Sequence, residues 1–540
     1  MAEKVTTTHL ETVIDATSTD VQRLIALARE GDEIDDSLTI KQALRKYKVA
    51  VFWALALSTA LIMEGYDLVM INSFFGQKQF QQHFGNIVAA NGDKRLSAAW
   101  QTGLSNSSLV GQLFGLVING WAQDRFGSRR TYIFFMFWMM AVIFIVVFAP
   151  NLEVLAFGEA MCGIPWGVFQ TLSTSYACEI VPTILRPYVT GYVCMCWGGG
   201  ILLSSGVQRA TLTLDSQWAW RLPFCLQWIW PLPLALIAYL APESPWNAVR
   251  RGQVELARTS LRRIRSKEAS EKEIDAVLAL IQHTTELEKA ETSGATYLDC
   301  FRGTNLRRTE INCVIWAAQI LCGNAILGYS IVFLQAAGFS ETNAFNLNIS
   351  LSACYIIGGI ICWFLMARIG RATIYMSGLL VMLIFLIVVG GLGFVDSTSS
   401  SLAIGILFVF LTLVNMTTIG PVCYPIVAES PSGRLRYKTI TIGRFVYNLT
   451  GLVTNTLTPR MVNDTAWNWG AKTAWFYAGT NALCLIWCWF RLPETKDRSF
   501  GELDLLFENR IPARKFKHTR VDQFTMQDDV QEVHIDDVKV

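Results

Sequence analysis

Apolar stretches long enough to cross a membrane recur along this chain and restrict what it can fold into. Residues 133–149, for example, contain no Asp, Glu, Lys or Arg. A helix needs about 20 apolar residues to cross a bilayer core roughly 30 Å thick. Only 16% of the 540 residues are charged, against roughly 25% in soluble proteins, so soluble domains of this total length would lack polar surface. The sequence therefore predicts an all-α membrane protein.

Twelve stretches have this character, and we predict that each forms a membrane-spanning helix. Gly163, Pro165 and Gly167 interrupt the fourth stretch, and neighbouring helices can re-satisfy the backbone groups that such a break releases. The predicted spans cover residues 49–71, 101–122, 131–149, 152–177, 187–208, 220–241, 312–336, 345–366, 373–395, 402–428, 438–459 and 473–491.

The placement of Lys and Arg between the spans predicts the orientation of the chain. If the N-terminus lies inside, the segments on that side hold 37 of the 45 Lys and Arg residues. Cytoplasmic loops carry such an excess of positive charge. We therefore expect a multi-pass protein with both termini in the cytoplasm.

Three motifs of the first half recur in the second half at spacings near 250 residues, which indicates an internal duplication. Two six-span halves in one orientation, joined by a charged linker, are the plan of many secondary transporters; a repeat that transports nothing is the alternative. The expected parts are a tail at 1–48, a half at 49–242, a linker at 243–311, a half at 312–492 and a tail at 493–540. The paired motifs are Glu179-x6-Arg186 with Glu429-x6-Arg436, Pro242-Glu-Ser with Pro493-Glu-Thr, and Arg125-Phe-Gly with Arg368-Ile-Gly.

Motifs of nucleotide, dinucleotide and metal chemistry are absent from the sequence. It contains no Gly-x4-Gly-Lys-Ser/Thr loop, no Gly-x-Gly-x-x-Gly turn and no Cys/His cluster with metal spacing. We therefore expect neither an enzyme nor a cofactor or metal site, and any transport must be driven by a gradient.

Seven short motifs, in order along the chain, carry a resemblance to a known family. Over residues 45–515 the chain resembles the sugar porter branch of the major facilitator superfamily, and within it the fungal α-glucoside (maltose-type) proton symporters. The resemblance implies two pseudo-symmetric six-helix halves that import an α-glucoside with protons by alternating access. It also implies a functional monomer in the plasma membrane, with no nucleic-acid partner. The motifs lie at 64–67, 120–130, 162–170, 242–245, 420–424, 493–496 and 501–507.

Charged residues at the cytoplasmic helix ends form the expected gate. Ion pairs between the loop at 124–130 and the motif at 179–186 would tie helix ends together in the outward-open state. The alternative is that the positive charges only orient the loops. Ala367 and Ala372 stand where the family often has charge, so the second copy should be the weaker latch. The gating candidates are Asp124, Arg125, Arg129, Arg130, Glu179, Arg186, Arg368, Arg371, Glu429, Arg436 and Arg444.

Acidic residues inside membrane spans are costly and usually functional. Glu64 and Asp67 are three positions apart on the first span, so they share a face, and Glu159 lies at comparable depth on the fourth. A typical sugar porter has an Arg near the position of Glu159. Two acids close together repel each other when both are ionised, so one should hold a proton. We predict that Asp67 and Glu159 carry or gate the coupling proton and that Glu64 assists; the alternative is that each acid is only hydrogen-bonded.

A sugar site needs polar groups for hydroxyls and aromatic rings for C–H faces. Candidates lie on five of the spans, and for each aromatic residue simple packing is the alternative. By resemblance, Gln319, Tyr329, Tyr424, Tyr447 and Asn448 align with sugar-contacting positions. The remaining substrate-binding candidates are Asn324, Trp166, Gln170 and Gln112.

Departures from the family pattern favour a larger sugar. Ile320 and Ala325 stand where sugar porters commonly have a second Gln and an Asn, and Cys194 replaces a Gln of the first half. These losses leave room for a disaccharide. Gln112 stands where maltose-type symporters carry Glu.

Arg444 is the only basic residue deep in a span, where it would neutralise an acid, bind hydroxyls or form a structural ion pair.

The linker should contain short amphipathic helices, such as 254–264, with Arg258, Arg262 and Arg265 on one side.

Two rival functions remain open. One is a facilitator or symporter for another sugar, an oligosaccharide or a polyol. The other is a non-transporting sugar receptor, which is disfavoured because such receptors carry a long cytoplasmic tail.

Overall fold

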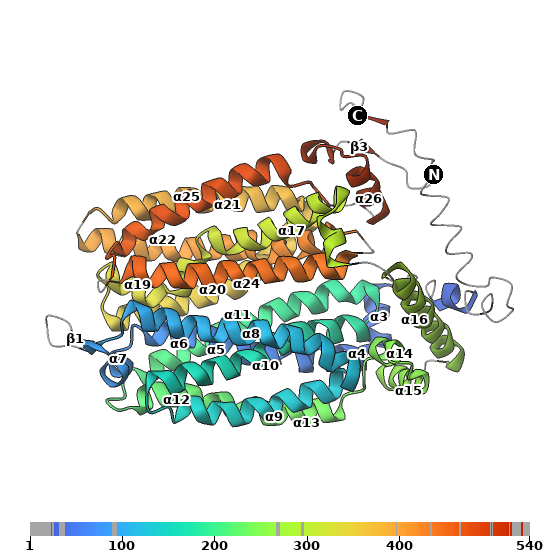
Figure 1. The fold of residues 1–540 in the computed structure, drawn as a ribbon, viewed down its shortest axis with the longest axis horizontal. Coiled ribbons are helices and arrows are strands. Elements are labelled where there is room, and N and C mark those ends of the chain that lie inside the picture. Colours follow the sequence, from blue (N-terminus) through green and yellow to red (C-terminus); the bar gives the residue numbers. More distant parts are fainter. Residues whose placement is uncertain are drawn as a thin grey trace.

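The computed structural model describes residues 38–88, 94–265, 270–292, 296–395, 397–432, 435–463, 466–496 and 500–517, with short pieces at 23, 26–31, 498, 519–520 and 531–532. Most of the predicted tail at 1–48 and much of the tail at 493–540 lie outside these residues. The described helices form an elongated bundle (Figure 1).

The first half of the bundle contains the first six predicted spans. Its elements are α3 (Ile40–Lys46), α4 (Lys48–Ser58), α5 (Ala60–Leu68), α6 (Met70–Phe74), α7 (Lys78–Phe84), β1 (Ile87–Val88), β2 (Lys94–Arg95), α8 (Ala98–Phe126), α9 (Ser128–Val147), α10 (Leu152–Ile180), α11 (Arg186–Thr211), α12 (Trp218–Leu226) and α13 (Pro231–Leu240).

The second half contains the other six predicted spans. Its elements are α17 (Gly303–Leu321), α18 (Asn324–Gly328), α19 (Ser330–Ala336), α20 (Glu341–Arg368), α21 (Arg371–Leu392), α22 (Thr398–Thr417), α23 (Ile419–Glu429), α24 (Arg436–Val462), α25 (Thr473–Arg491) and α26 (Phe500–Glu508). Two short strands follow, β3 (Thr519–Arg520) and β4 (Gln531–Glu532).

The twelve predicted spans are confirmed, because each corresponds to one long helix or to a row of shorter helices. Within the described residues, seven segments are long and apolar enough to cross a membrane by length and composition alone. Helices α8 and α24 are rich in Ser, Thr, Asn and Gln. They pack against each other between the halves, as α11 packs against α20 (Figure 1). The more polar helices thus face the interior rather than lipid.

Each half has its own buried core. One large cluster of buried apolar side chains is built almost entirely from the first half, and a second cluster is built from the second half. This separation leaves the surface between the halves free to carry polar side chains. A two-half architecture of this kind is the predicted fold.

The predicted interruption of the fourth span is wrong, since α10 runs unbroken through Gly163, Pro165 and Gly167. The glycines instead allow α8 and α10 to touch. A Cβ placed on Gly111 would lie 2.9 Å from the Cα of Gly163, and one on Gly115 would lie 3.0 Å from the Cα of Gly167. Small residues at a helix interface permit this close approach.

Other spans do break near their middle. The first is interrupted at Thr59 and Val69, the seventh at Gly323 and Tyr329, and the tenth at Thr418. Gly323 has a φ of 107°, a left-handed conformation that favours glycine. Interior breaks release backbone groups, which neighbouring helices can satisfy.

The described part of the linker contains three α-helices that precede α17, namely α14 (Pro245–Arg250), α15 (Val254–Ile264) and α16 (Glu271–Thr292). They lie with α3 and α26 at one end of the bundle, the linker end, whereas α7 and β1 lie at the opposite, far end (Figure 1). The three arginines expected on one side of α15 all pair with acids of α16. The bonds are Arg258–Asp275 at 2.5 Å, Arg262–Glu271 at 2.6 Å and Arg265–Glu273 at 3.4 Å.

Candidate functional site

The acid Asp67 lies on α5 in the interior of the first half and accepts two hydrogen bonds. The indole Nε1 of Trp166 on α10 donates to Oδ2 at 3.0 Å, and Nε2 of Gln227 donates to Oδ1 at 2.6 Å. All three side chains are buried. Both donors are neutral, so the arrangement satisfies both oxygens of an ionised carboxylate without cancelling its charge.

Glu159 on α10 is buried beside Asp67 but has a different environment. It interacts electrostatically with Asp67, and Cys162 one turn along interacts with both acids. No hydrogen bond to the Glu159 carboxyl is formed among the residues that the structure describes. The structure therefore brings the two predicted acids together and gives hydrogen-bond donors to only one of them.

Gln227 was missed by the sequence reasoning. It lies between α12 and α13, in the sixth span, where it is surrounded by apolar residues. A single amide in so apolar a stretch is the signal that could have identified it, because a buried amide needs a partner.

The third acid, Glu64, contacts the second half through a glutamine. Nε2 of Gln170 on α10 donates to Oε1 of Glu64, and Oε1 of Gln170 accepts a 2.9 Å hydrogen bond from Nη2 of Arg444 on α24. Gln112 on α8 lies 3.4 Å from the same Gln170 nitrogen. Oε2 of Glu64 is buried and accepts no hydrogen bond of normal geometry within the described chain.

Aromatic rings surround Arg444. Its guanidinium lies 4.8 Å from the ring centre of Trp316 on α17 and 4.5 Å from that of Tyr447. The Trp316 ring meets Tyr424 and Tyr447 edge to face, each at 5.3 Å. Trp316 was not among the sequence candidates, although it precedes Gln319 by three positions and so shares its helix face.

Several sugar candidates on the second half hold buried polar atoms without partners. Nε2 of Gln319 donates to the carbonyl of Gly420 at 3.1 Å, but its Oε1 has no partner. The same holds for both amide atoms of Asn448 and for Oδ1 of Asn324, counting the described residues only. An unsatisfied buried polar atom costs about 1–3 kcal/mol. A ligand with many hydroxyl groups would supply the missing partners.

Hydrogen bonds between the two halves gather toward the far end. Tyr329 belongs to this set, because its hydroxyl donates to Ser105 at 2.9 Å. The contacts further include Gln335 to the Gly76 carbonyl at 2.8 Å, the Lys78 N–H to Glu341 at 2.9 Å, Asn106 to Thr456 at 3.0 Å, Arg209 to Asn346 at 2.6 Å, and Ser205 with Ser352 at 2.7 Å.

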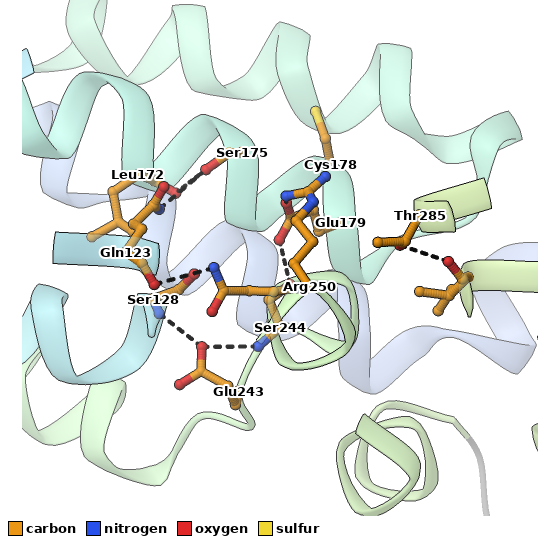
Figure 2. Close-up of polar contacts among 12 residues, drawn as sticks. Gln123, Ser128, Leu172, Ser175, Cys178, Glu179, Glu243, Ser244, Arg250 and Thr285 are labelled. Atoms are coloured by element: carbon orange, nitrogen blue, oxygen red, sulfur yellow. Dashed lines mark hydrogen bonds and ion pairs between the residues drawn. The ribbon is translucent and has the colours of Figure 1, made fainter. Parts of the chain in front are cut away.

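At the linker end, the Pro242–Glu243–Ser244 motif joins several helix ends (Figure 2). Oε1 of Glu243 accepts from the backbone N–H of Ser128, the first residue of α9, at 2.8 Å. Glu179 accepts from the hydroxyl of Ser244 and pairs with Arg250 at 2.8 Å. Burial raises the pKa of Glu243, and its backbone donors oppose this shift. A carboxylate at a helix N-terminus satisfies free N–H groups and the helix dipole.

The expected ion pairs between the loop at 124–130 and Glu179 are not formed in this conformation. Asp124 and Arg130 are exposed and contact no described partner. Arg125 lies over Trp121 at 5.8 Å, and Arg129 over Tyr239 at 5.1 Å. Arg186 donates to the Cys178 carbonyl at 3.1 Å. The linker motif, rather than the loop, occupies the position between α9 and α10.

The second copy of these motifs has longer polar contacts. Arg371 approaches Glu429 at 3.5 Å, and Glu494 approaches the N–H groups of Ala372 and Thr373 at 3.4 Å each. Arg368 is exposed and Arg436 is half-buried at the start of α24. The side chains of Ala367 and Cys194 lie outside the described residues.

Three comparisons with known proteins give the family and the fold of the chain. Residues 53–507 match the family model described as sugar (and other) transporter. The chain is 39% identical over 502 residues to the maltose permease MAL61 of Saccharomyces cerevisiae, covering 92% of this chain and 82% of that protein. It is 40% identical over 504 residues to a general alpha-glucoside permease of S. cerevisiae, covering 92% and 81%. The fold matches a solved structure of XylE of E. coli, a major facilitator superfamily proton:xylose symporter, bound to 6-bromo-6-deoxy-D-glucose. The TM-score is 0.67 at 19% identity, and the match covers 86% of this chain and 100% of the other.

Proposed function

We propose that this chain, which belongs to the family of sugar and other transporters, imports α-glucosides such as maltose together with protons. The observation that carries the proposal is the buried pair of Asp67 and Glu159 beside an interior with unpartnered amides. The first feature suits a proton, and the second suits an uncharged ligand with many hydroxyls.

Proton carriage follows from the environments of the two acids. Asp67 accepts from Trp166 and Gln227, whereas Glu159 has no donor within the described chain. Two carboxylates this near to each other cannot both be ionised at low cost, so one proton resides on the pair. A proton is then loaded from one side of the membrane and released on the other when the surroundings change.

The sugar site lies mainly on the second half. Gln319 and Asn448 offer amide atoms to sugar hydroxyls, and Asn324 and Tyr329 border the same broken span. The rings of Trp316, Tyr424 and Tyr447 offer faces for the C–H groups of a sugar. Trp166, Gln170 and Gln112 complete the site from the first half.

Alternating access uses the two ends of the bundle in turn. The inter-half hydrogen bonds at the far end close that side, and the Glu243 and Glu179 contacts hold the helix ends on the linker side. Opening one end while closing the other moves the sugar across. We place the linker end and both tails in the cytoplasm, with a functional monomer in the plasma membrane, divided at 48, 242, 311 and 492 as the sequence suggests.

The test is uptake by cells that lack their own sugar transporters. Cells that express the chain are given labelled maltose, sucrose, trehalose, lactose or glucose, with and without a protonophore. We expect accumulation of maltose that the protonophore abolishes, accompanied by alkalinisation of the medium. Glucose uptake alone, unaffected by the protonophore, would reject the proposal in favour of a facilitator. Sugar binding without uptake would favour a receptor.

A further inference from the structure

The side-chain amide of Gln170 lies between an acid of one half and a cation of the other. Its Nε2 donates to Oε1 of Glu64 on α5, and its Oε1 accepts from Arg444 on α24 at 2.9 Å. A guanidinium has only donors, so the amide oxygen must face Arg444 and the amide nitrogen must face Glu64. The orientation of this amide is therefore determined by its neighbours.

We infer that Gln170 is a positioning residue that transmits the protonation of Glu64 to the sugar-binding side of the interior, an inference that rests on the proposed proton-coupled import. When Glu64 is ionised, its hydrogen bond from Gln170 is charge-assisted, and the polarised amide is a better acceptor for Arg444. A proton taken up by the Glu64 carboxyl removes that charge and weakens both bonds. Gln170 itself neither gains nor loses a proton.

The surroundings of Glu64 fit this role. The charged groups that act on it are Asp67, one turn along α5, and Arg444 across the interface. The other polar neighbours, Trp197 on α11 and Gln112 beside the Gln170 nitrogen, carry no charge. Arg444 and Tyr447 of the second half also interact with Glu64 directly through space. Gln170 adds a hydrogen-bonded connection between Glu64 and Arg444.

Proton and sugar then act on the same contact. To separate the halves at this level, the bond between Gln170 and Arg444 must break. A proton on Glu64 weakens that bond from one side, and a sugar hydroxyl that accepts from Arg444 competes for it from the other. Because both ligands favour the separated state, each one raises the affinity for the other.

The experiment uses the full chain, purified for binding and reconstituted in vesicles for transport. Maltose affinity is followed by tryptophan fluorescence between pH 5 and pH 8, and maltose-driven proton influx is followed with an enclosed pH-sensitive dye. Gln170→Leu removes both hydrogen bonds. Gln335→Leu is the matched control, because it removes another inter-half glutamine contact that involves no titratable group.

For the unmodified chain we expect maltose affinity to fall as the pH rises. In Gln170→Leu this pH dependence should shrink about fivefold or more, and proton influx per maltose should fall. Gln335→Leu should keep the pH dependence. Gln170→Met keeps the length of the side chain but offers neither a donor to Glu64 nor an amide acceptor to Arg444. It should therefore also lose the pH dependence, and it provides the test if Gln170→Leu does not fold.

Two results separate the inference from the proposed function. If the unmodified chain shows no maltose-driven proton influx, proton coupling itself is wrong and the inference falls with it. If the unmodified chain is proton-coupled and both Gln170 variants keep its pH dependence and proton-to-maltose ratio, the inference alone is overturned.

Discussion

Nε2 of Gln227 lies 2.6 Å from Oδ1 of Asp67, and this contact distinguishes two acids that look alike in the sequence. With Trp166 on its other oxygen, Asp67 is held as an acceptor. Glu159, buried beside it, has no donor within the described chain. The pair thus contains one carboxylate that the protein solvates and one that it does not.

The first prediction concerns this donor. Gln227→Leu should lower the rate of maltose-driven proton influx about tenfold or more, because a hydrogen bond to a charged group contributes about 1.5–3 kcal/mol. Gln227→Asn, which keeps an amide, should restore part of the rate. Stopped-flow measurement in vesicles checks both variants. If Gln227→Leu and the unmodified chain show equal rates of proton influx, Gln227 contributes only packing at this position.

The second prediction concerns the acids themselves. Asp67→Asn and Glu159→Gln should each abolish maltose-driven proton influx, since each leaves a single titratable group where two share a proton. Maltose counterflow, which moves no net protons, should persist in at least one of them. If both variants retain proton influx, these acids do not carry the proton.

A third prediction concerns Trp316, which stacks with Arg444 and meets two tyrosines. Trp316→Leu should raise the KM for maltose about tenfold, because aromatic and cation–π contacts together contribute about 1–2 kcal/mol. Labelled uptake over a range of maltose concentrations measures this effect. Trp489, half-exposed on the outside of α25, is the control for loss of a tryptophan; Trp489→Leu should leave the KM unchanged.

A fourth prediction concerns the linker end. Glu179→Gln or Arg250→Gln should lower the free energy of unfolding by about 1 kcal/mol, as expected for a partly exposed ion pair, and the double variant should lose little more than either single one. Asp124→Asn removes a charge that has no described partner in this conformation. It should change the free energy of unfolding by less than about 0.5 kcal/mol. A larger loss for Asp124→Asn than for Glu179→Gln would indicate that the loop, not the linker, holds α10.

The fifth prediction is a pH dependence of stability from Glu243, which lies outside the membrane spans. Burial raises the pKa of this carboxyl above its ordinary value of 4.5. The folded state therefore holds the proton more tightly than the unfolded state, so the contribution of this group to stability falls as the pH rises past 4.5. Glu243→Gln should flatten this decline relative to the unmodified chain. The measurement is the unfolding temperature between pH 4 and pH 8 for both proteins. If Glu243→Gln and the unmodified chain show the same slope of unfolding temperature against pH, Glu243 does not contribute to the pH dependence.

The sequence was informative about spans and about rare charges for a simple reason. Crossing a bilayer requires about 20 apolar residues, so every span leaves a local signal, and each acid within a span stands out against it. Glu64, Asp67 and Glu159 were predicted in this way. The interruption of the fourth span was predicted wrongly, because Gly163, Pro165 and Gly167 give the same local signal whether a helix breaks or packs closely.

Side chains that act through a distant neighbour left a weaker signal. Gln227 is marked only as a lone amide in an apolar stretch, and Trp316 only by sharing a helix face with Gln319. Both matter because of what other helices bring to them. The contacts of Ser244 and Arg250 with Glu179 likewise depend on how the linker folds back. Helix rotation is set by packing against neighbours rather than by the sequence of one span.

The sequence by itself thus determined which segments enter the membrane, their repeat and the few charges they carry, because hydrophobicity and helix length are properties of each segment alone. Only the tertiary structure decided which acid receives donors, which amides stay unpartnered and that Gln170 joins Glu64 to Arg444. These features depend on contacts between residues 99 to 274 positions apart, and a hydrogen bond exists only when packing brings its two ends within about 3 Å.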